Sequence, residues 1–311
     1  MECDSSSTVV FIISPLSRND GRLIHVYTAS FEYRRAHSVD EALHWLQKDP
    51  ENSKILAGGH SLLPLMKLML AEPQILIDIG RISALQGIWV EDNGVRIGAY
   101  TTYAEIVHNQ EIIRFCPLLA QVAATIGDVQ VRNRGTIGGS LCHADPQADM
   151  PAAALALDAE LVMESPRGQR VESASGFFQA PFMTSLAADE MLTAIRIPKM
   201  PSPVLSTYLK RPHPASGYPV IGVALWLKVD GVVVRQCHLA ITGIAMLPFR
   251  AFKVEEYVQG QKLDAQTIAR ASALAQEDAV LEEDEDGYKS YLLQVYVERA
   301  FWQLLQSSLN E

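Results

Sequence analysis

The sequence predicts an α+β fold, because amphipathic helix patterns and short strand patterns mix along the whole chain. Near the start, a capped helix after Ser38 is followed by the short apolar strand Lys54–Ala57. In the last third, the strands Val220–Val229 and Val232–Ile241 flank an Asp-Gly dipeptide, which is a strong hairpin signal. The chain has 311 residues, a length that predicts two or three sub-domains.

The first elements follow from local signals. Residues 1–25 are Ser-rich and then polar, and are expected to form an N-terminal extension. Ser38 and Glu41 predict a capping box, and Leu43 and Leu46 supply the apolar face of the helix that follows. The next predicted elements are the strand Lys54–Ala57, a helix over Ser61–Leu70 with Pro64 in its first turn, the strands Gln74–Ile79 and Val95–Ala99, and a helix over Pro117–Ile126.

In the second half, Asp145 is expected to be the N-cap of a helix that runs to Leu157, with Pro146 at its first position. The Pro-rich stretch Pro198–Pro203 indicates a boundary. We therefore expect one domain over residues 26–200, divided near residue 82, and another over residues 201–311. The remaining predicted elements are the strands Leu161–Glu164 and Met191–Ile197, the helices Ala265–Ala279 and Tyr288–Leu309, and a solvated acidic loop, Glu282–Asp286.

Composition excludes several functions. The formal net charge is −10, which argues against binding to nucleic acid or to anionic membranes, because both need clustered Lys and Arg. No apolar run is long enough to cross a membrane. The 4 cysteines are scattered without metal-ligand spacing, so we expect reduced cysteines in a cytoplasmic protein and no iron–sulfur cluster held by this chain alone.

The first glycine segment, Ala57-Gly58-Gly59-His60-Ser61, follows a predicted strand. Two glycines at a strand end let the backbone turn sharply and approach a ligand closely. Exposed N–H groups before a helix form a natural anion site, and the Ser61 hydroxyl could donate to a phosphate or cap the helix. A tight turn followed by a capped helix is the alternative interpretation, and a lone Gly-Gly favours it.

The second glycine segment, Thr136-Ile137-Gly138-Gly139-Ser140, repeats these residue types. Two anion-binding segments predict a ligand with two phosphates. Asp149 follows in the next predicted helix, where it could accept hydrogen bonds from ribose or adenine, or merely favour the helix N-terminus. His143 is more simply a packed loop residue than a metal ligand. The chain lacks both GxGxxG and a Walker lysine, so neither nucleotide-binding fold applies.

These motifs resemble the FAD-binding medium subunit of molybdenum hydroxylases, the group with carbon monoxide dehydrogenase and bacterial xanthine dehydrogenase. The resemblance extends from about residue 27 to the C-terminus. It implies a two-part FAD-binding domain of the p-cresol methylhydroxylase type and then a small α+β domain. The segments that carry it are Leu56–Pro64, which includes Leu62, Leu76–Ile79, Val131–Ser140 and His143–Asp149.

The resemblance also implies roles for single residues. The two glycine segments would bind the FAD pyrophosphate, and Asp149 would bind the nucleotide end. Thr101 matches another flavin-contacting stretch, while Lys210 and Tyr218 match positions near the isoalloxazine ring. The family often has Asp before that aromatic residue, where this chain has Gly217, which puts hydrogen bonding at the ring in question rather than FAD binding.

The resemblance implies an electron relay. A large molybdopterin subunit would oxidise the substrate, two [2Fe–2S] clusters in a small subunit would carry electrons, and FAD in this chain would pass them on to NAD, oxygen or a quinone. The expected assembly is a dimer of heterotrimers. One alternative is a self-sufficient FAD-dependent reductase of the UDP-N-acetylenolpyruvoylglucosamine reductase type, and another is a flavin-binding scaffold protein without turnover. The resemblance implies that the substrate pocket lies in a partner chain.

Overall fold

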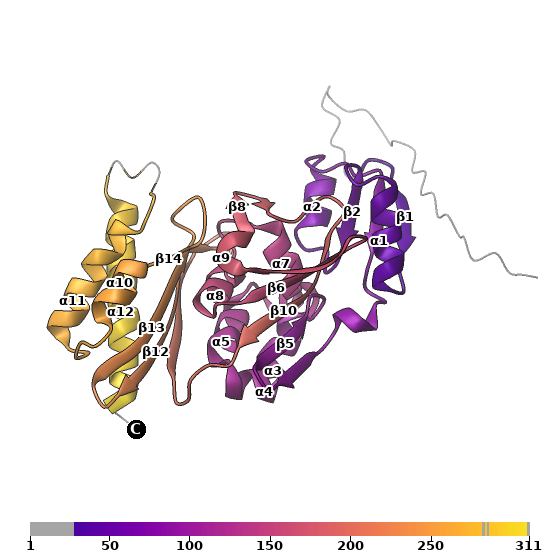
Figure 1. The fold of residues 1–311 in the computed structure, drawn as a ribbon. Helices are drawn as coiled ribbons and strands as arrows, with labels where there is room; N and C mark the ends of the chain where they lie inside the picture. The colour runs from indigo at the N-terminus through magenta and orange to yellow at the C-terminus, as the bar shows by residue number, and fades with distance from the viewer. Residues whose placement is uncertain (1–27, 282–283, 285, 310–311) are drawn as a thin grey trace, which may run out of the picture.

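The computed structural model describes residues 28–281, 284 and 286–309, and its elements form three blocks in a row (Figure 1). The first block is built around β1–β3, the second around β4–β10, and the third around β11–β14. The mixture of helices and strands confirms the predicted α+β class. The expected extension over residues 1–25 lies outside the described residues, as do Glu282, Glu283 and Glu285 of the acidic loop.

The first block is a parallel sheet with the strand order β1-β3-β2. Its elements are β1 (Glu32–Arg35), α1 (Val39–Lys48), β2 (Ser53–Leu56), α2 (Leu62–Lys67) and β3 (Ile75–Asp78). Ser38 caps α1 as predicted, because its hydroxyl accepts a hydrogen bond from the Glu41 N–H at 3.1 Å. The Glu41 carboxylate accepts from the His37 N–H at 2.8 Å. Helix α1 thus buries its predicted apolar face against the sheet.

Helix α2 is shorter than the prediction of Ser61–Leu70. It begins at Leu62 and ends at Lys67, and Met69 has a φ of 56°, which breaks the helical path. Ser61 makes no capping hydrogen bond with its hydroxyl. The interpretation that the Ser61 hydroxyl caps this helix is therefore wrong, and the hydroxyl can bind another partner.

The second block has an antiparallel sheet with the order β4-β5-β10-β6-β7. Its helices pack on this sheet around a core that is rich in Ala, Leu and Ile. The elements are η1 (Ser83–Leu85), β4 (Ile88–Glu91), β5 (Gly94–Gly98), α3 (Tyr103–His108), α4 (Gln110–Phe115), α5 (Pro117–Thr125), α6 (Val129–Arg134), α7 (Ile137–His143), α8 (Met150–Ala156), β6 (Glu160–Ser165), β7 (Gly168–Ser173), α9 (Ala174–Phe177), β8 (Phe178–Ala180), β9 (Met183–Thr184) and β10 (Met191–Pro198).

The predicted start of the helix at Asp145 is wrong. Helix α8 begins at Met150, with Asp149 at its N-cap position. The Asp145 carboxylate instead accepts a hydrogen bond from the Gln147 N–H at 2.8 Å, which closes a local turn before the helix. Such turns compete with helix formation for the same side chain. Asp149, rather than Asp145, therefore lies at the N-terminus of the buried helix α8.

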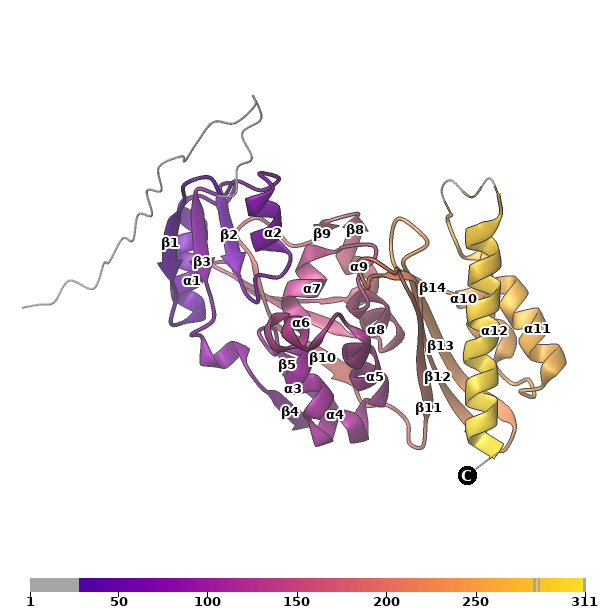
Figure 2. The same cartoon turned by 180° about the vertical axis from the view of Figure 1, so that it is seen from behind.

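The third block is the antiparallel sheet β11-β12-β13-β14 with helices on one face. Its elements are β11 (Leu205–Pro212), β12 (Pro219–Asp230), β13 (Val233–Thr242), β14 (Phe249–Arg250), α10 (Phe252–Val258), α11 (Ala265–Leu274), η2 (Ala275–Glu277) and α12 (Tyr288–Leu309). The predicted hairpin is confirmed, with Gly231 at a φ of 58°. Figure 2 shows α12 lying along the outer side of this sheet.

Strand β12 joins the second and third blocks. Alternate residues face opposite sides, so Ala224 and Trp226 pack in the core of the second block while Val223 and Leu225 pack against α12. The Trp226 indole N–H donates to the Ala156 carbonyl at the end of α8, at 2.7 Å. The third block is therefore fixed against the second through a shared, buried sheet face. No helix in the described part of the chain combines the length and apolarity of a membrane span.

Candidate functional site

A cavity of about 780 Å³ lies where the three blocks meet. This volume is within the usual range for sites that bind small molecules and cofactors. Its walls include 13 of the residues named above on sequence grounds: Ala57, Gly58, Gly59, His60, Ser61, Leu62, Thr136, Gly138, Gly139, Ser140, Asp149, Lys210 and Tyr218. Thr101 and Ile137 do not line it. The fold thus brings together residues from distant parts of the chain.

The first glycine segment presents unpaired donors to this cavity. Gly59 has a φ of 80°, a conformation that glycine adopts readily. Within the part of the chain that the structure describes, the N–H groups of Gly59, His60, Ser61 and Leu62 donate no hydrogen bond. Four consecutive unpaired N–H groups in a segment that lines a cavity can form an anion-binding site. They fit a phosphate group, whose oxygens only accept hydrogen bonds at neutral pH.

The second glycine segment is the start of helix α7, with Thr136 at the N-cap position. Its N–H groups already have acceptors: Ile137 donates to the Thr101 carbonyl at 3.0 Å and Gly138 to the Ala99 carbonyl at 2.9 Å. The Gly139 N–H donates to the Thr136 hydroxyl oxygen at 3.1 Å. This segment can therefore offer a ligand the hydroxyl groups of Thr136 and Ser140, and its glycines leave room for other groups to come close to the backbone.

Glycine allows the two segments to touch. A Cβ atom on Gly58 would lie 2.0 Å from the Arg134 carbonyl oxygen, just before the second segment. A Cβ atom on Gly139 would be 3.8 Å from the Ala57 Cβ. A side chain at Gly58 would push the first and second blocks apart, whereas one at Gly139 would only contact Ala57 across the two segments. The two glycine segments therefore lie next to each other and line the same cavity.

Asp149 is the centre of a buried polar group at the cavity. Its Oδ1 accepts a hydrogen bond from the Tyr208 hydroxyl at 2.6 Å, and its Oδ2 lies 2.9 Å from the Lys210 ammonium. Burial raises the pKa of Asp149, and the Lys210 charge and the Tyr208 hydrogen bond oppose this rise. Lys210 also donates to the Thr125 carbonyl at 3.2 Å. This group can offer a ligand both a cation and hydrogen-bond partners.

The ion pair bears on the expected roles of its two members. The resemblance implied that Asp149 meets the nucleotide end of FAD and Lys210 the ring end. The two side chains touch, so the structure brings them together at one place in the cavity wall. Tyr218 lines the same cavity, and its pKa is raised by burial and then by the charges of Asp145 and Asp149.

Thr101 lies behind the cavity wall. Its side chain is fully buried, and its hydroxyl donates to the Gly87 carbonyl at 3.0 Å and accepts from the Gly87 N–H at 3.2 Å. Its own carbonyl accepts from Ile137. Thr101 therefore ties the chain entering β4 to the start of α7, and Ile137 packs in the core of the second block.

Sequence reasoning missed part of the cavity wall. The segment between β8 and β10 contributes Phe182 and Met183, which are exposed at the cavity. No periodic pattern marks this segment. Tyr208, which donates to Asp149 but does not line the cavity, was also missed, although a signal existed: it lies two residues before Lys210 in a strand, so both point to one face. His143 lines the cavity at the end of α7, 5.2 Å from the Phe182 ring between centroids, and burial lowers its pKa.

The chain matches known proteins over nearly all of its described length. Residues 29–200 match the FAD binding domain in molybdopterin dehydrogenase, and residues 206–304 match the CO dehydrogenase flavoprotein C-terminal domain. The glyceraldehyde dehydrogenase medium chain of Sulfolobus acidocaldarius is 39% identical over 239 residues, which cover 77% of this chain and 84% of that one. The carbon monoxide dehydrogenase medium chain of Hydrogenophaga pseudoflava is 36% identical over 275 residues, covering 87% and 95%.

A solved structure agrees with these matches. Carbon monoxide dehydrogenase from Hydrogenophaga pseudoflava superimposes with a TM-score of 0.87 at 35% identity, covering 91% of this chain and 99% of that one. The unpaired N–H groups and the cavity fit the FAD that the matched domain binds. The chain therefore belongs to the FAD-binding medium subunits of the molybdenum hydroxylases, a family of oxidoreductases, with an FAD binding domain followed by the CO dehydrogenase flavoprotein C-terminal domain.

Proposed function

We propose that this chain is the electron-transfer subunit of a molybdenum hydroxylase, in which FAD takes electrons from [2Fe–2S] clusters of a partner and passes them to an external acceptor. One observation carries the proposal. Relatives named for glyceraldehyde and for carbon monoxide dehydrogenases are 39% and 36% identical to this chain. Substrates so different share a medium chain whose matched domain binds FAD, which supports a role in the common electron path rather than in substrate oxidation.

We propose that different walls of the cavity bind different portions of FAD. The N–H groups of Gly59–Leu62 would hold the pyrophosphate, and the hydroxyl groups of Thr136 and Ser140 would donate to it from the facing wall. FAD supplies the exchange of single electrons for pairs. Thr101 would act indirectly, by holding the second glycine segment in place.

We assign Asp149, Lys210 and Tyr218 together to the ring end of FAD. An aromatic side chain next to a charged pair suits the isoalloxazine, which has a flat face and a polar edge. Tyr218 would lie along the ring, while Lys210 and Asp149 would orient its polar edge. The expectation that Asp149 binds the nucleotide end is replaced here, because Lys210 touches it.

The proposal includes partners. The relatives are medium chains, and we propose a large molybdopterin subunit and a small subunit with two [2Fe–2S] clusters, assembled as a dimer of heterotrimers in the cytoplasm. The mass of the complex purified from its native host, together with its chain, metal and flavin content, tests this. Equal amounts of three chains would support the proposal, and a chain that purifies alone with full activity would contradict it.

The relay itself is tested by flavin reduction. Substrate of the native complex, added without oxygen, should bleach the flavin absorption of the complex but not that of this chain reconstituted with FAD. Adding both partner chains back should restore bleaching. If the isolated chain with FAD oxidised the substrate at the rate of the complex, the self-sufficient reductase would replace the relay. The matched family does not favour that alternative.

A further inference from the structure

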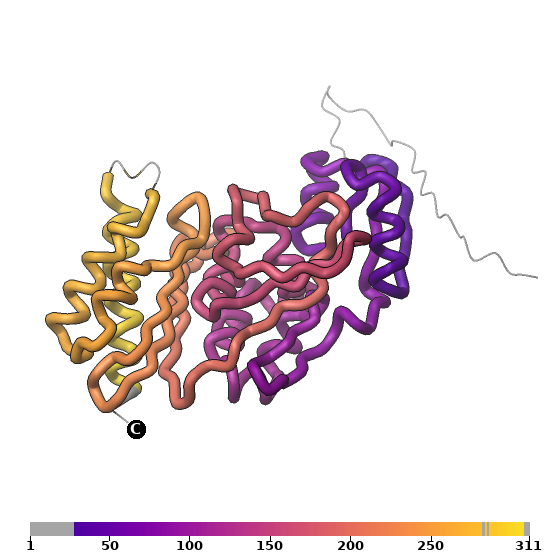
Figure 3. Tube along the Cα trace, in the orientation of Figure 1, coloured from indigo at the N-terminus to yellow at the C-terminus, as the bar shows by residue number. Residues whose placement is uncertain are grey.

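One wall of the cavity is formed by residues 182–190, which we call the wall segment. Its lining residues are Phe182, Met183, Thr184, Leu186, Ala187, Ala188 and Glu190. The segment starts where the Phe182 N–H donates to the Ala144 carbonyl after α7, at 2.9 Å. The residue that follows the segment, Met191, begins β10 and packs in the core of the first block. Figure 3 shows this stretch of chain reaching from the second block toward the first.

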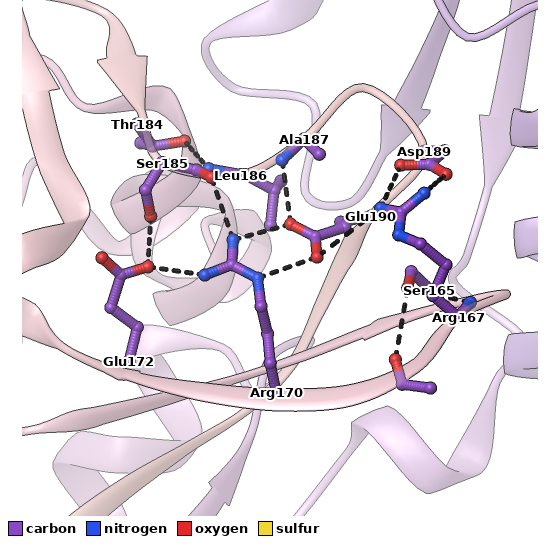
Figure 4. Close-up of polar contacts among 11 residues, drawn as sticks. Ser165, Arg167, Arg170, Glu172, Thr184, Ser185, Leu186, Ala187, Asp189 and Glu190 are labelled. Carbon is purple, nitrogen blue, oxygen red and sulfur yellow. Dashed lines mark hydrogen bonds and ion pairs between the residues drawn. The ribbon is translucent and has the colours of Figure 1, made fainter.

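Arg170 holds the wall segment from outside the cavity. From strand β7, its Nε donates to Glu190 Oε1 at 2.8 Å and its Nη2 to Glu190 Oε2 at 2.7 Å (Figure 4). The same Nη2 donates to the Ser185 carbonyl at 2.9 Å. A bidentate pair of this kind is directional as well as strong. One guanidinium therefore fixes both the middle and the end of the wall segment.

Other groups complete the arrangement around Arg170. Its Nη1 donates to Glu172 Oε2 at 2.7 Å, and the Ser185 hydroxyl donates to the same carboxylate (Figure 4). Glu190 Oε2 also accepts from the Ala187 N–H at 2.9 Å. The wall segment thus has its side chains and its backbone tied to one point on the sheet.

The Arg170–Glu190 ion pair is more buried than the neighbouring Arg167–Asp189 ion pair. The Glu190 side chain is 6% exposed, and hydrogen bonding to Arg170 lowers its pKa. The nearby pair Arg167–Asp189 joins the turn before β7 to the wall segment, but Arg167 is 62% exposed, against 39% for Arg170, and its contact with Glu190 is a distant one of 4.0 Å. Exposed ion pairs contribute little, whereas removing one partner of a buried pair is costly. Arg167 is therefore a matched control for Arg170.

We propose that Arg170 is a positioning residue for FAD: through Glu190 and Ser185 it keeps the wall segment closed over the cavity and so slows release of the cofactor. Arg170 itself does not line the cavity, so it acts through the segment. The inference rests on the proposal that this cavity holds FAD.

The test measures FAD release from the purified complex after dilution, by the recovery of free flavin fluorescence. Arg170→Met should release FAD at least about tenfold faster than the wild type. The release rate of Arg170→Lys should lie between the two, because lysine keeps the positive charge but cannot make the bidentate hydrogen bonds of a guanidinium. Arg167→Met should stay within about twofold of the wild type. Protease cleavage within the wall segment should accelerate in the same order.

A double variant separates positioning from stability. Arg170→Met leaves the Glu190 carboxylate buried without its partner, so the chain loses stability. Arg170→Met with Glu190→Gln removes that charge and should recover the melting temperature, yet still release FAD quickly. Release at the wild-type rate from the folded double variant, or an equal effect from Arg167→Met, would overturn the inference alone. A wild-type complex without FAD in this cavity would overturn the proposed function as well.

Discussion

The Lys210 ammonium lies 2.9 Å from the Asp149 carboxylate, and both side chains are 6% exposed. The two residues are 61 positions apart in the sequence. Asp149 precedes helix α8 of the second block, and Lys210 lies on strand β11 of the third. One buried ion pair therefore couples the cavity to the contact between the two matched domains.

Removing the ammonium should make stability depend on pH. Burial already raises the pKa of Asp149 from its ordinary value of 3.8, and Lys210→Met would raise it further. For a carboxyl group with a raised folded pKa, its contribution to stability is complete below the unfolded pKa and is lost as pH rises through the folded pKa. The melting temperature of Lys210→Met should therefore fall further below the wild type at about pH 8 than at about pH 5.

The double variant Lys210→Met with Asp149→Asn serves as the control for this prediction. It has no carboxyl group to titrate at position 149, so its gap to the wild type should be nearly the same at both pH values. A gap for Lys210→Met alone that did not change with pH would show that Asp149 keeps its charge compensated by other groups.

Gly59→Ala should weaken FAD binding, and Gly260→Ala should not. Gly59 has a φ of 80° and Gly260 a φ of 81°, so alanine costs about 1–2 kcal/mol of strain at each. Only Gly59 belongs to the unpaired N–H groups at the cavity, and nothing lies within 4 Å of a Cβ on Gly260. Equilibrium dialysis with FAD measures the difference. Equal affinities in the two variants would show that the first glycine segment does not hold the cofactor.

Gly138→Val should destabilise the fold before it affects the cofactor. A Cβ on Gly138 would lie 2.6 Å from the Ala99 carbonyl oxygen, which accepts the Gly138 N–H. Overpacking of this kind costs on the order of 1–3 kcal/mol. Thermal unfolding of the chain without FAD should show the loss. An unchanged melting temperature together with lost FAD would instead place Gly138 at the pyrophosphate.

FAD should be bound without a covalent link. Cys142 and His143 line the cavity, but burial raises the pKa of the Cys142 thiol to about 12. A thiol that stays protonated at neutral pH is a poor nucleophile. Acid precipitation should leave the flavin in the supernatant, and the denatured chain should have the mass of the polypeptide alone. A chain heavier by one flavin would contradict this.

Elements with local signals could be predicted from the sequence. The cap at Ser38 and the hairpin turn at Gly231 are each set by a few neighbouring residues. The start of helix α8 could not be predicted in this way, because Asp145 can serve either as a helix cap or as the acceptor in a turn. The structure takes the turn, with the Gln147 N–H as donor.

In the site, too, some features are set by neighbouring residues and others depend on contacts between distant parts of the chain. The first glycine segment lines the cavity with backbone N–H groups that have no acceptor among the described residues, a feature that its own sequence predicts. The second has the same residue types, yet the N–H groups of Ile137 and Gly138 are satisfied by the carbonyls of Thr101 and Ala99, which lie far away in the sequence. Arg170 and Glu190 meet only through the fold. Long-range contacts of this kind leave no periodic pattern in one sequence.

Tyr218→Ala should leave FAD bound but change how the flavin reacts with its acceptor. Tyr218 lies in the connection between β11 and β12, lines the cavity and is 40% exposed. Its loss therefore removes little buried surface, and the remaining cavity walls still hold the cofactor. What disappears is an aromatic face beside the proposed ring end. The flavin spectrum, its reduction potential and the rate of reoxidation by the acceptor should all shift.

Tyr218→Phe is the control, because it keeps the ring face and removes only the hydroxyl group. It should resemble the wild type in the flavin spectrum. If spectrum, potential and reoxidation were the same in Tyr218→Ala and the wild type, Tyr218 would not be a neighbour of the ring. Asp149 and Lys210 would then lose the reason for their assignment to that end of FAD, because that assignment depends on Tyr218 as the aromatic residue lining the same cavity.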